Sequence, residues 1–299
     1  MKLNDILLVC AALLPAIVLC VYVFKKDKVE KEPIGLLLLL LLSGVLICYP
    51  AATVEGVLFE IIDNIFMPFG YEEGGEIYLD DTTFKIYNAC IYFIGVALVE
   101  EGFKFIAMYL ITRNNKNFNS LFDGLIYAVF VSLGFAGFEN IFYVLDYGWT
   151  NAVMRALMSV PGHMFFAVLM GYYYSMWHMY EKAGERERFY KNAGFIDPAA
   201  PEFSGSKYLA LCLIIPTLGH GLYDYCCTIG TPLATVGLYA FLIFLYIYCF
   251  ARIRKMSKGD MYDTTYSNVM VFRKHPYLVE ALRKNAEVNQ QVPEPNVEV

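Results

Sequence analysis

Seven long apolar stretches dominate this sequence, and each can cross a lipid bilayer, which takes about 20 helical residues. They lie at residues 5–24, 34–54, 86–111, 121–145, 152–177, 208–227 and 233–251. Within hydrocarbon every backbone polar group needs an internal partner, so such stretches are predicted to be helices. The net charge of -6 provides no basic surface for a nucleic acid. The sequence therefore predicts an all-α, polytopic membrane bundle of about seven transmembrane helices.

The charges of the connecting loops predict the orientation. Lys and Arg are concentrated in loops 25–33, 112–120 and 178–207 and just after residue 251, whereas loops 55–84, 146–151 and 228–232 contain neither. Basic loops lie on the cytoplasmic side of membrane proteins. We therefore expect a multi-pass protein of the cell membrane, with its N-terminus outside and its C-terminus inside.

We expect residues 1–251 to form a single transmembrane domain and residues 252–299 to form a cytoplasmic tail. Apolar residues in the acidic outer loop 55–84 predict a short helix on the membrane interface, and loop 178–207 is predicted to be a solvated hinge. In the tail, residues 277–288 have helical apolar spacing, and the last ten residues are predicted to be disordered.

Ionisable residues inside the predicted spans indicate function, because a charge in the bilayer core is costly. Eight ionisable or amide side chains stand out in spans three to six: Glu100, Glu101, Lys104, Glu139, Asn140, His163, His220 and Asp224. At 1.5 Å rise per residue, Glu139 and His220 lie roughly 10–12 Å below the outer boundary. Glu100 and His163 lie roughly 18–22 Å below it. Four helices are thus expected to bring these side chains into one layer.

Two spacings within single helices support this interpretation. Glu100 and Lys104 are four residues apart and share a face, so the lysine can neutralise one carboxylate and leave the other for chemistry. His220 and Asp224 are also four apart, and the carboxylate can accept the second ring N–H of the imidazole and orient it. Taken singly, each feature is also typical of an ion pair or hydrogen bond that holds helices together. Their coincidence at one depth favours a functional site.

Histidine and carboxylate ligands with one open position are typical of a catalytic zinc site. We interpret Glu139, His163 and His220 as the ligands, and Glu100 or Glu101 as the general base that activates water and then protonates the leaving amine. A metal-free alternative stays open, in which Glu100 activates water directly and a neutral histidine binds the oxyanion. Both alternatives hydrolyse a peptide bond of a membrane-associated protein.

The order of these residues resembles the four-motif signature of the PrsW family of intramembrane proteases. The resemblance lies within residues 85–228, the expected catalytic core. The four strings that carry it are Glu100-Glu101-Gly102-Phe103-Lys104, Gly137-Phe138-Glu139-Asn140, His163 after Pro161-Gly162, and His220-Gly221-Leu222-Tyr223-Asp224. This family is related to the CAAX-processing and bacteriocin-immunity membrane proteases. The resemblance implies a multi-helix membrane peptidase with a metal-dependent or glutamate-dependent site.

The resemblance also implies which residues act and on what kind of partner. It points to the paired glutamates Glu100 and Glu101, to Glu139, to His163, and to His220 with its neighbour four residues on. The best-known role in the family is the first cleavage of a membrane-anchored anti-sigma factor on its outer side. Neither loop 55–84 nor the tail belongs to the signature, so the identity of the substrate does not follow from it.

Two other classes of membrane protein use buried charges. A proton-coupled transporter or channel would use the Glu/His cluster as a relay, but a relay strings ionisable groups across the whole bilayer. Transporters also usually have broken helices in paired halves, and no internal repeat of useful length is present. A seven-helix receptor does not need two histidines and paired glutamates at metal-ligand distance. The sequence favours the peptidase, and it does not indicate an oligomeric state.

Overall fold

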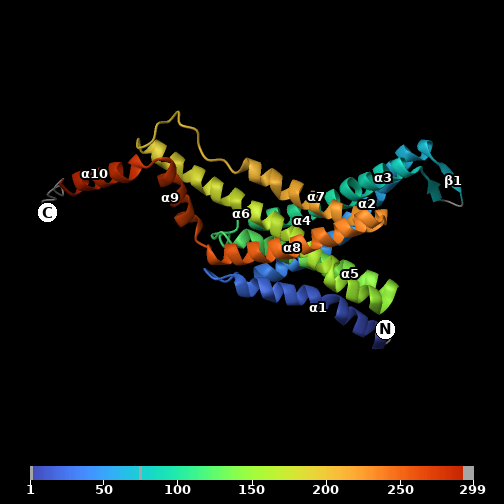
Figure 1. The fold of residues 1–299 in the computed structure, drawn as a ribbon. Coiled ribbons are helices and arrows are strands. Elements are labelled where there is room, and N and C mark those ends of the chain that lie inside the picture. Colours follow the sequence, from blue (N-terminus) through green and yellow to red (C-terminus); the bar gives the residue numbers. More distant parts are fainter. Residues whose placement is uncertain (1–2, 74–75, 292–299) are drawn as a thin grey trace.

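The computed structural model describes residues 3–73 and 76–291. They form an elongated helical bundle with one short β-hairpin (Figure 1). The elements are α1 (Leu3–Lys26), α2 (Ile34–Phe66), η1 (Met67–Phe69), β1 (Tyr71–Glu73), β2 (Glu76–Tyr78), α3 (Asp81–Cys90), η2 (Ile91–Ala97), α4 (Leu98–Thr112), α5 (Asp123–Leu157), α6 (Ser159–Asn192), α7 (Ser206–Ile229), α8 (Pro232–Lys258), α9 (Asp263–Lys274) and α10 (Tyr277–Gln291). The predicted helical membrane bundle is confirmed, and the antiparallel hairpin β1–β2 is an addition to it.

Five helical segments of the described chain are long and apolar enough to cross a membrane. One of them, 123–192, contains both α5 and α6. The segment from α3 to α4, which carries Glu100, Glu101 and Lys104, is not among the five. The number of seven spans and the orientation therefore stay predictions. The start of α1 and the hairpin lie at one end of the bundle, and α9 and α10 lie at the other (Figure 1).

Two predicted loops are helical over part of their length. α2 continues to Phe66, so the apolar residues expected to form a separate interfacial helix belong to the C-terminal end of α2. The prediction of a hinge is wrong for residues 178–192, which continue α6. They do so because Ala183 and Tyr190 are buried in a small apolar cluster that includes Val271 of α9. α6 ends just before Gly194, whose positive φ of 77° is typical of a helix C-terminus.

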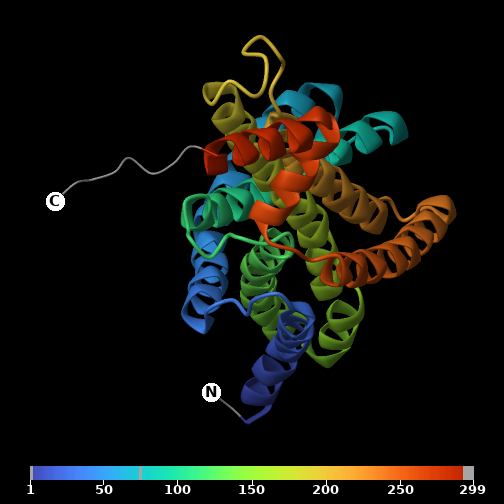
Figure 2. The same cartoon turned by 90° about the vertical axis from the view of Figure 1, so that its left-hand side faces the viewer.

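The tail contains more helix than the sequence predicted. α10 confirms the helix expected over residues 277–288, whereas α9 was not predicted. In the view from this end, α9 and α10 lie in front of the bundle (Figure 2). Residues 292–299, which make up most of the predicted disordered end, lie outside the described residues.

The long helix α5 packs against α1, α2 and α6 and is buried along its first half. α2 and α5 touch backbone to backbone at two glycines. A Cβ atom on Gly44 would lie 2.0 Å from the carbonyl oxygen of Val131, and one on Gly134 would lie 2.0 Å from that of Leu41. Small residues allow this close approach in membrane helices. The contact fixes α5 against α2.

Replacing Gly44 with alanine is expected to destabilise the protein by about 1–3 kcal/mol, because the added methyl group overlaps backbone atoms that cannot rotate away. Gly56 lies in the same helix and has open space around it. Gly56→Ala is therefore the matched control, and it should be neutral or slightly stabilising. Thermal unfolding of both variants in detergent measures the difference. Equal midpoints for the two variants would contradict the close contact between α2 and α5.

Candidate active site

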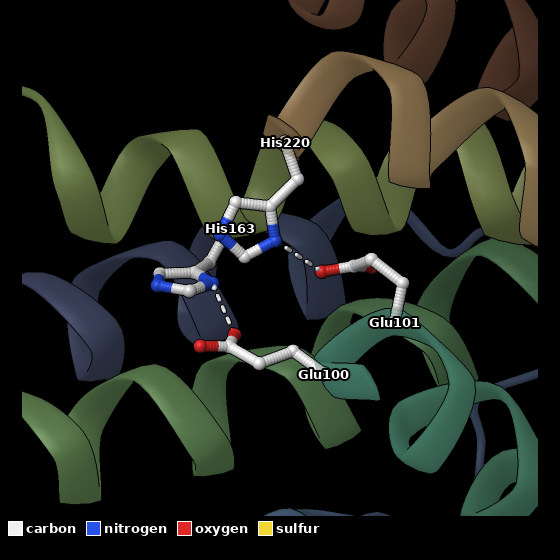
Figure 3. Close-up of side chains that lie close together, drawn as sticks. All are labelled: Glu100, Glu101, His163 and His220. Atoms are coloured by element: carbon white, nitrogen blue, oxygen red, sulfur yellow. Dashed lines mark hydrogen bonds and ion pairs between the residues drawn. The ribbon is translucent and has the colours of Figure 1, made fainter. Parts of the chain in front are cut away.

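Four acidic and imidazole side chains from three helices meet inside the bundle (Figure 3). Glu100 and Glu101 lie in the first turn of α4, directly after the π-helical segment η2, and such segments are frequent at functional sites. His163 projects from α6 and His220 from α7. All four are buried, and one ligand atom of each lies within 4.8 Å of those of the others.

Lys104 lies against three members of this group. Its ammonium is 2.8 Å from Glu100 Oε2 and 2.9 Å from Glu101 Oε1. It also lies 3.2 Å from His163 Nδ1. The sequence predicted that the lysine would neutralise one carboxylate and leave the other free, but it contacts both. The position of the ammonium shows that the two carboxylates and the imidazole surround a place suited to positive charge.

Each histidine has one ring nitrogen toward this group and the other toward a carboxylate outside it. His220 Nδ1 lies 3.0 Å from Glu101 Oε1, and its Nε2 lies 3.2 Å from Asp224 Oδ2. His163 Nδ1 lies 4.0 Å from Glu100 Oε2, and its Nε2 lies 3.4 Å from Glu139 Oε2. Metal-binding histidines usually have such an outer carboxylate, which fixes the tautomer and the ring orientation.

Arg155 is a member of the site that the sequence interpretation did not single out. It donates to Glu139 Oε2 at 2.6 Å and to Asn140 Oδ1 at 2.7 Å. The Asn140 amide in turn donates to the Ala12 carbonyl of α1. The non-helical backbone of Gly148, with φ 74°, interrupts α5 and separates residues 149–157 from its main part. An arginine inside a predicted span was the available signal.

A cavity of about 600 Å³ opens beside the group. Glu100, His163 and His220 line it, as do the outer carboxylates Glu139 and Asp224. Glu101 and Lys104 are not among the lining residues, and both are at most 1% exposed. Phe166 stacks on the His220 ring with centroids 5.0 Å apart. Glu100 is therefore the member of the glutamate pair that faces the space in which water and a peptide can bind.

The four side chains are suitable ligands for a metal ion. Two carboxylates and two imidazoles are ligands that zinc and similar divalent ions accept. Among the described residues nothing hydrogen-bonds to Glu101 Oε2, although this atom is fully buried. An unpaired buried oxygen is costly unless a ligand satisfies it. The buried Glu/Glu/His/His group can therefore hold a metal, while Glu139 lies outside the four and is paired with Arg155.

Comparison with known proteins identifies the family. The model of the PrsW family of intramembrane metalloproteases matches residues 32–251. The protease PrsW of Oceanobacillus iheyensis is 28% identical over 251 residues, which cover 84% of this chain and 96% of the relative. That of Clostridioides difficile is 29% identical, covering 82% and 88% of the two chains, and that of Bacillus subtilis is 27% identical, covering 85% and 97%. No solved structure is significantly similar.

Proposed function

The chain belongs to the PrsW family of intramembrane metalloproteases, and we propose that it hydrolyses a peptide bond of a membrane-anchored protein at the buried Glu/His group. It is a multi-pass protein of the cell membrane and a protease. The observation that carries the proposal is the convergence of four ligand-type side chains within 4.8 Å beside a cavity of about 600 Å³.

The proposed metal is zinc, held by Glu101, His163 and His220. Three protein ligands with one open position are typical of catalytic zinc sites. When bound, zinc polarises a carbonyl group and lowers the pKa of water. The sequence interpretation placed Glu139 among the ligands, but its contacts support a different role. Glu139 and Asp224 accept the outer N–H groups of the two histidines and hold the rings in place.

Glu100 is the proposed general base. Its carboxylate lines the cavity, so it can take a proton from a water molecule there. The water oxygen attacks the carbonyl carbon of the substrate, and Glu100 then transfers the proton to the leaving amide nitrogen as the C–N bond breaks. Lys104 Nζ lies 2.8 Å from Glu100 Oε2 and places a positive charge beside this buried carboxylate.

The metal-free alternative has one observation in its favour. Lys104 already supplies a positive charge to both glutamates and lies 3.2 Å from His163 Nδ1. In that alternative Glu100 activates water without a metal, and a histidine N–H binds the oxyanion. The two alternatives make opposite predictions about metal removal, which is therefore the experiment that tests the proposal.

Chelation is expected to stop cleavage. The purified protein is reconstituted in liposomes with a single-span protein that it cleaves, and it should contain about one zinc per chain. After metal removal the rate should fall to about 1% or less of its initial value, and added zinc should restore it. Undiminished cleavage by the metal-free protein would contradict the zinc site and favour the glutamate-only alternative.

The sequence-based orientation, with the N-terminus outside, puts the site nearer the outer face, and residues 252–299 in the cytoplasm. We propose cleavage of the substrate on its outer side, since Glu139 and His220 are expected roughly 10–12 Å below the outer boundary. That the substrate is an anti-sigma factor stays a prediction from the family resemblance.

A further inference from the structure

A second cavity, here called the side pocket, lies between α2 and α5 and has a volume of about 320 Å³. Most of its wall is uncharged and largely aromatic: Cys48, Tyr49, Ala52, Phe135, Phe138 and Phe142. The pocket begins just beyond the point where Gly44 and Gly134 bring the two helix backbones together. Toward their outer ends α2 and α5 leave room for a ligand between them.

The side pocket adjoins the catalytic cavity. Glu55, Glu100 and Glu139 line both spaces. A group bound in the side pocket therefore lies next to Glu100, the proposed general base. A substrate whose side chain occupies the side pocket can place the adjacent peptide bond in the larger cavity.

The side pocket is also accessible from the direction of the bilayer. Tyr49 on α2 and Phe142 on α5 lie at its rim, and 81% and 55% of their surfaces are exposed in the isolated chain. Large apolar side chains exposed on a membrane bundle face lipid. A membrane-anchored substrate can therefore approach between α2 and α5 without separating α5 from α6.

The lining selects the kind of side chain that binds. Aromatic walls favour an apolar group, because each buried methylene stabilises the complex by about 0.8 kcal/mol. An acidic side chain is disfavoured by Glu55, Glu100 and Glu139 in the shared wall. The space exceeds that of a small residue such as alanine.

We propose that the side pocket is a specificity subsite that binds one large apolar side chain of the substrate, such as Leu or Phe, beside the scissile bond. This inference rests on the proposed function and names the feature by which the protease chooses its cleavage position. A lipid acyl chain is the competing occupant.

Another apolar groove provides a matched control. It has a volume of about 460 Å³ and is lined by Ala11 and Val18 of α1, Trp149 and Tyr246, among others. None of its lining residues lines the catalytic cavity. A substitution there changes an apolar groove of the membrane face without touching the proposed subsite.

The test compares cleavage preferences within each variant. Single-span peptides in liposomes carry Ala, Leu, Phe, Trp or Asp at each position around the wild-type cleavage bond, and mass spectrometry measures the products. At one position the wild type should prefer Leu or Phe over Ala and Asp by at least about tenfold. Ala52→Phe fills the pocket and should shift this preference toward Ala by at least about tenfold, whereas Phe138→Ala enlarges it and should favour Trp. Ala11→Phe should leave the preference unchanged.

Because each preference is a ratio within one variant, a lower overall rate does not affect it. Wild-type preferences in both Ala52→Phe and Phe138→Ala would overturn the subsite while leaving the protease intact. Loss of a copurifying lipid from Ala52→Phe, with its preference unchanged, would assign the pocket to lipid. If the wild type cleaves no single-span peptide, the proposed function fails, and the subsite fails with it.

Discussion

Replacing Glu100 with glutamine is expected to slow peptide cleavage by about 10²- to 10⁴-fold, the contribution of a positioned general base. Glutamine keeps the shape of the side chain but cannot take the proton from water. The zinc content should stay at the wild-type level, because Glu100 faces the cavity and is not one of the three proposed ligands. Glu101→Gln, by contrast, should lose both zinc and cleavage. Cleavage rates and metal content measured on the same preparations separate the two roles.

The control is Glu60→Gln, an exposed position on α2 that does not line the cavity. It should behave as the wild type. His163→Ala and His220→Ala should abolish cleavage as Glu101→Gln does. Asp224→Asn and Glu139→Gln alter the carboxylates that orient the two rings, and they should reduce cleavage about 10- to 100-fold. Wild-type rates in both Glu100→Gln and His220→Ala would show that the active site lies elsewhere.

Lys104→Met is expected to destabilise the metal-free protein by about 3–5 kcal/mol, because it removes the ammonium that pairs with two buried carboxylates. Lys104 is 1% exposed and lies within 3 Å of both glutamates. In the double variant Glu100→Gln/Lys104→Met, the glutamine substitution removes one of the two carboxylate charges. The double variant should therefore recover part of the lost stability. Unfolding in detergent after chelation measures the effect without a contribution from bound metal.

Lys85→Met provides the comparison. Lys85 also pairs with an acid one turn away, Asp81, at 2.6 Å, but both side chains are exposed to solvent. Such exposed pairs contribute little to stability, because solvent screens the two charges. If Lys104→Met is no more harmful than Lys85→Met, the buried glutamates do not depend on the lysine for their charge balance.

The sequence predicted the members of the site better than their contacts. The cost of a charge in hydrocarbon singled out Glu100, Glu101, His163 and His220, which meet within 4.8 Å. Helical spacing also predicted that Asp224 would reach His220. Both inferences use properties local to one helix, together with the depth of each residue in the membrane.

Contacts between helices depend on how each helix is rotated about its own axis. The residues of one helix do not by themselves determine that rotation. Arg155 reaches Glu139 because Gly148 interrupts α5, and that change of direction cannot be read from hydropathy. Glu55 was assigned to a loop, although α2 continues past it and carries it to the wall of both cavities. Likewise α9 was missed because its apolar residues pack against an extension of α6 that was expected to be a hinge.

X-ray absorption at the zinc edge of the purified protein tests the central claim, that two histidines and a buried glutamate from three helices share one ion. The expected spectrum has nitrogen and oxygen neighbours at about 2.0–2.2 Å and the scattering of two imidazole rings per zinc. His163→Ala and His220→Ala should each lose the bound zinc. A shell of sulfur at about 2.3 Å, or a zinc ion without imidazole neighbours, would contradict the site.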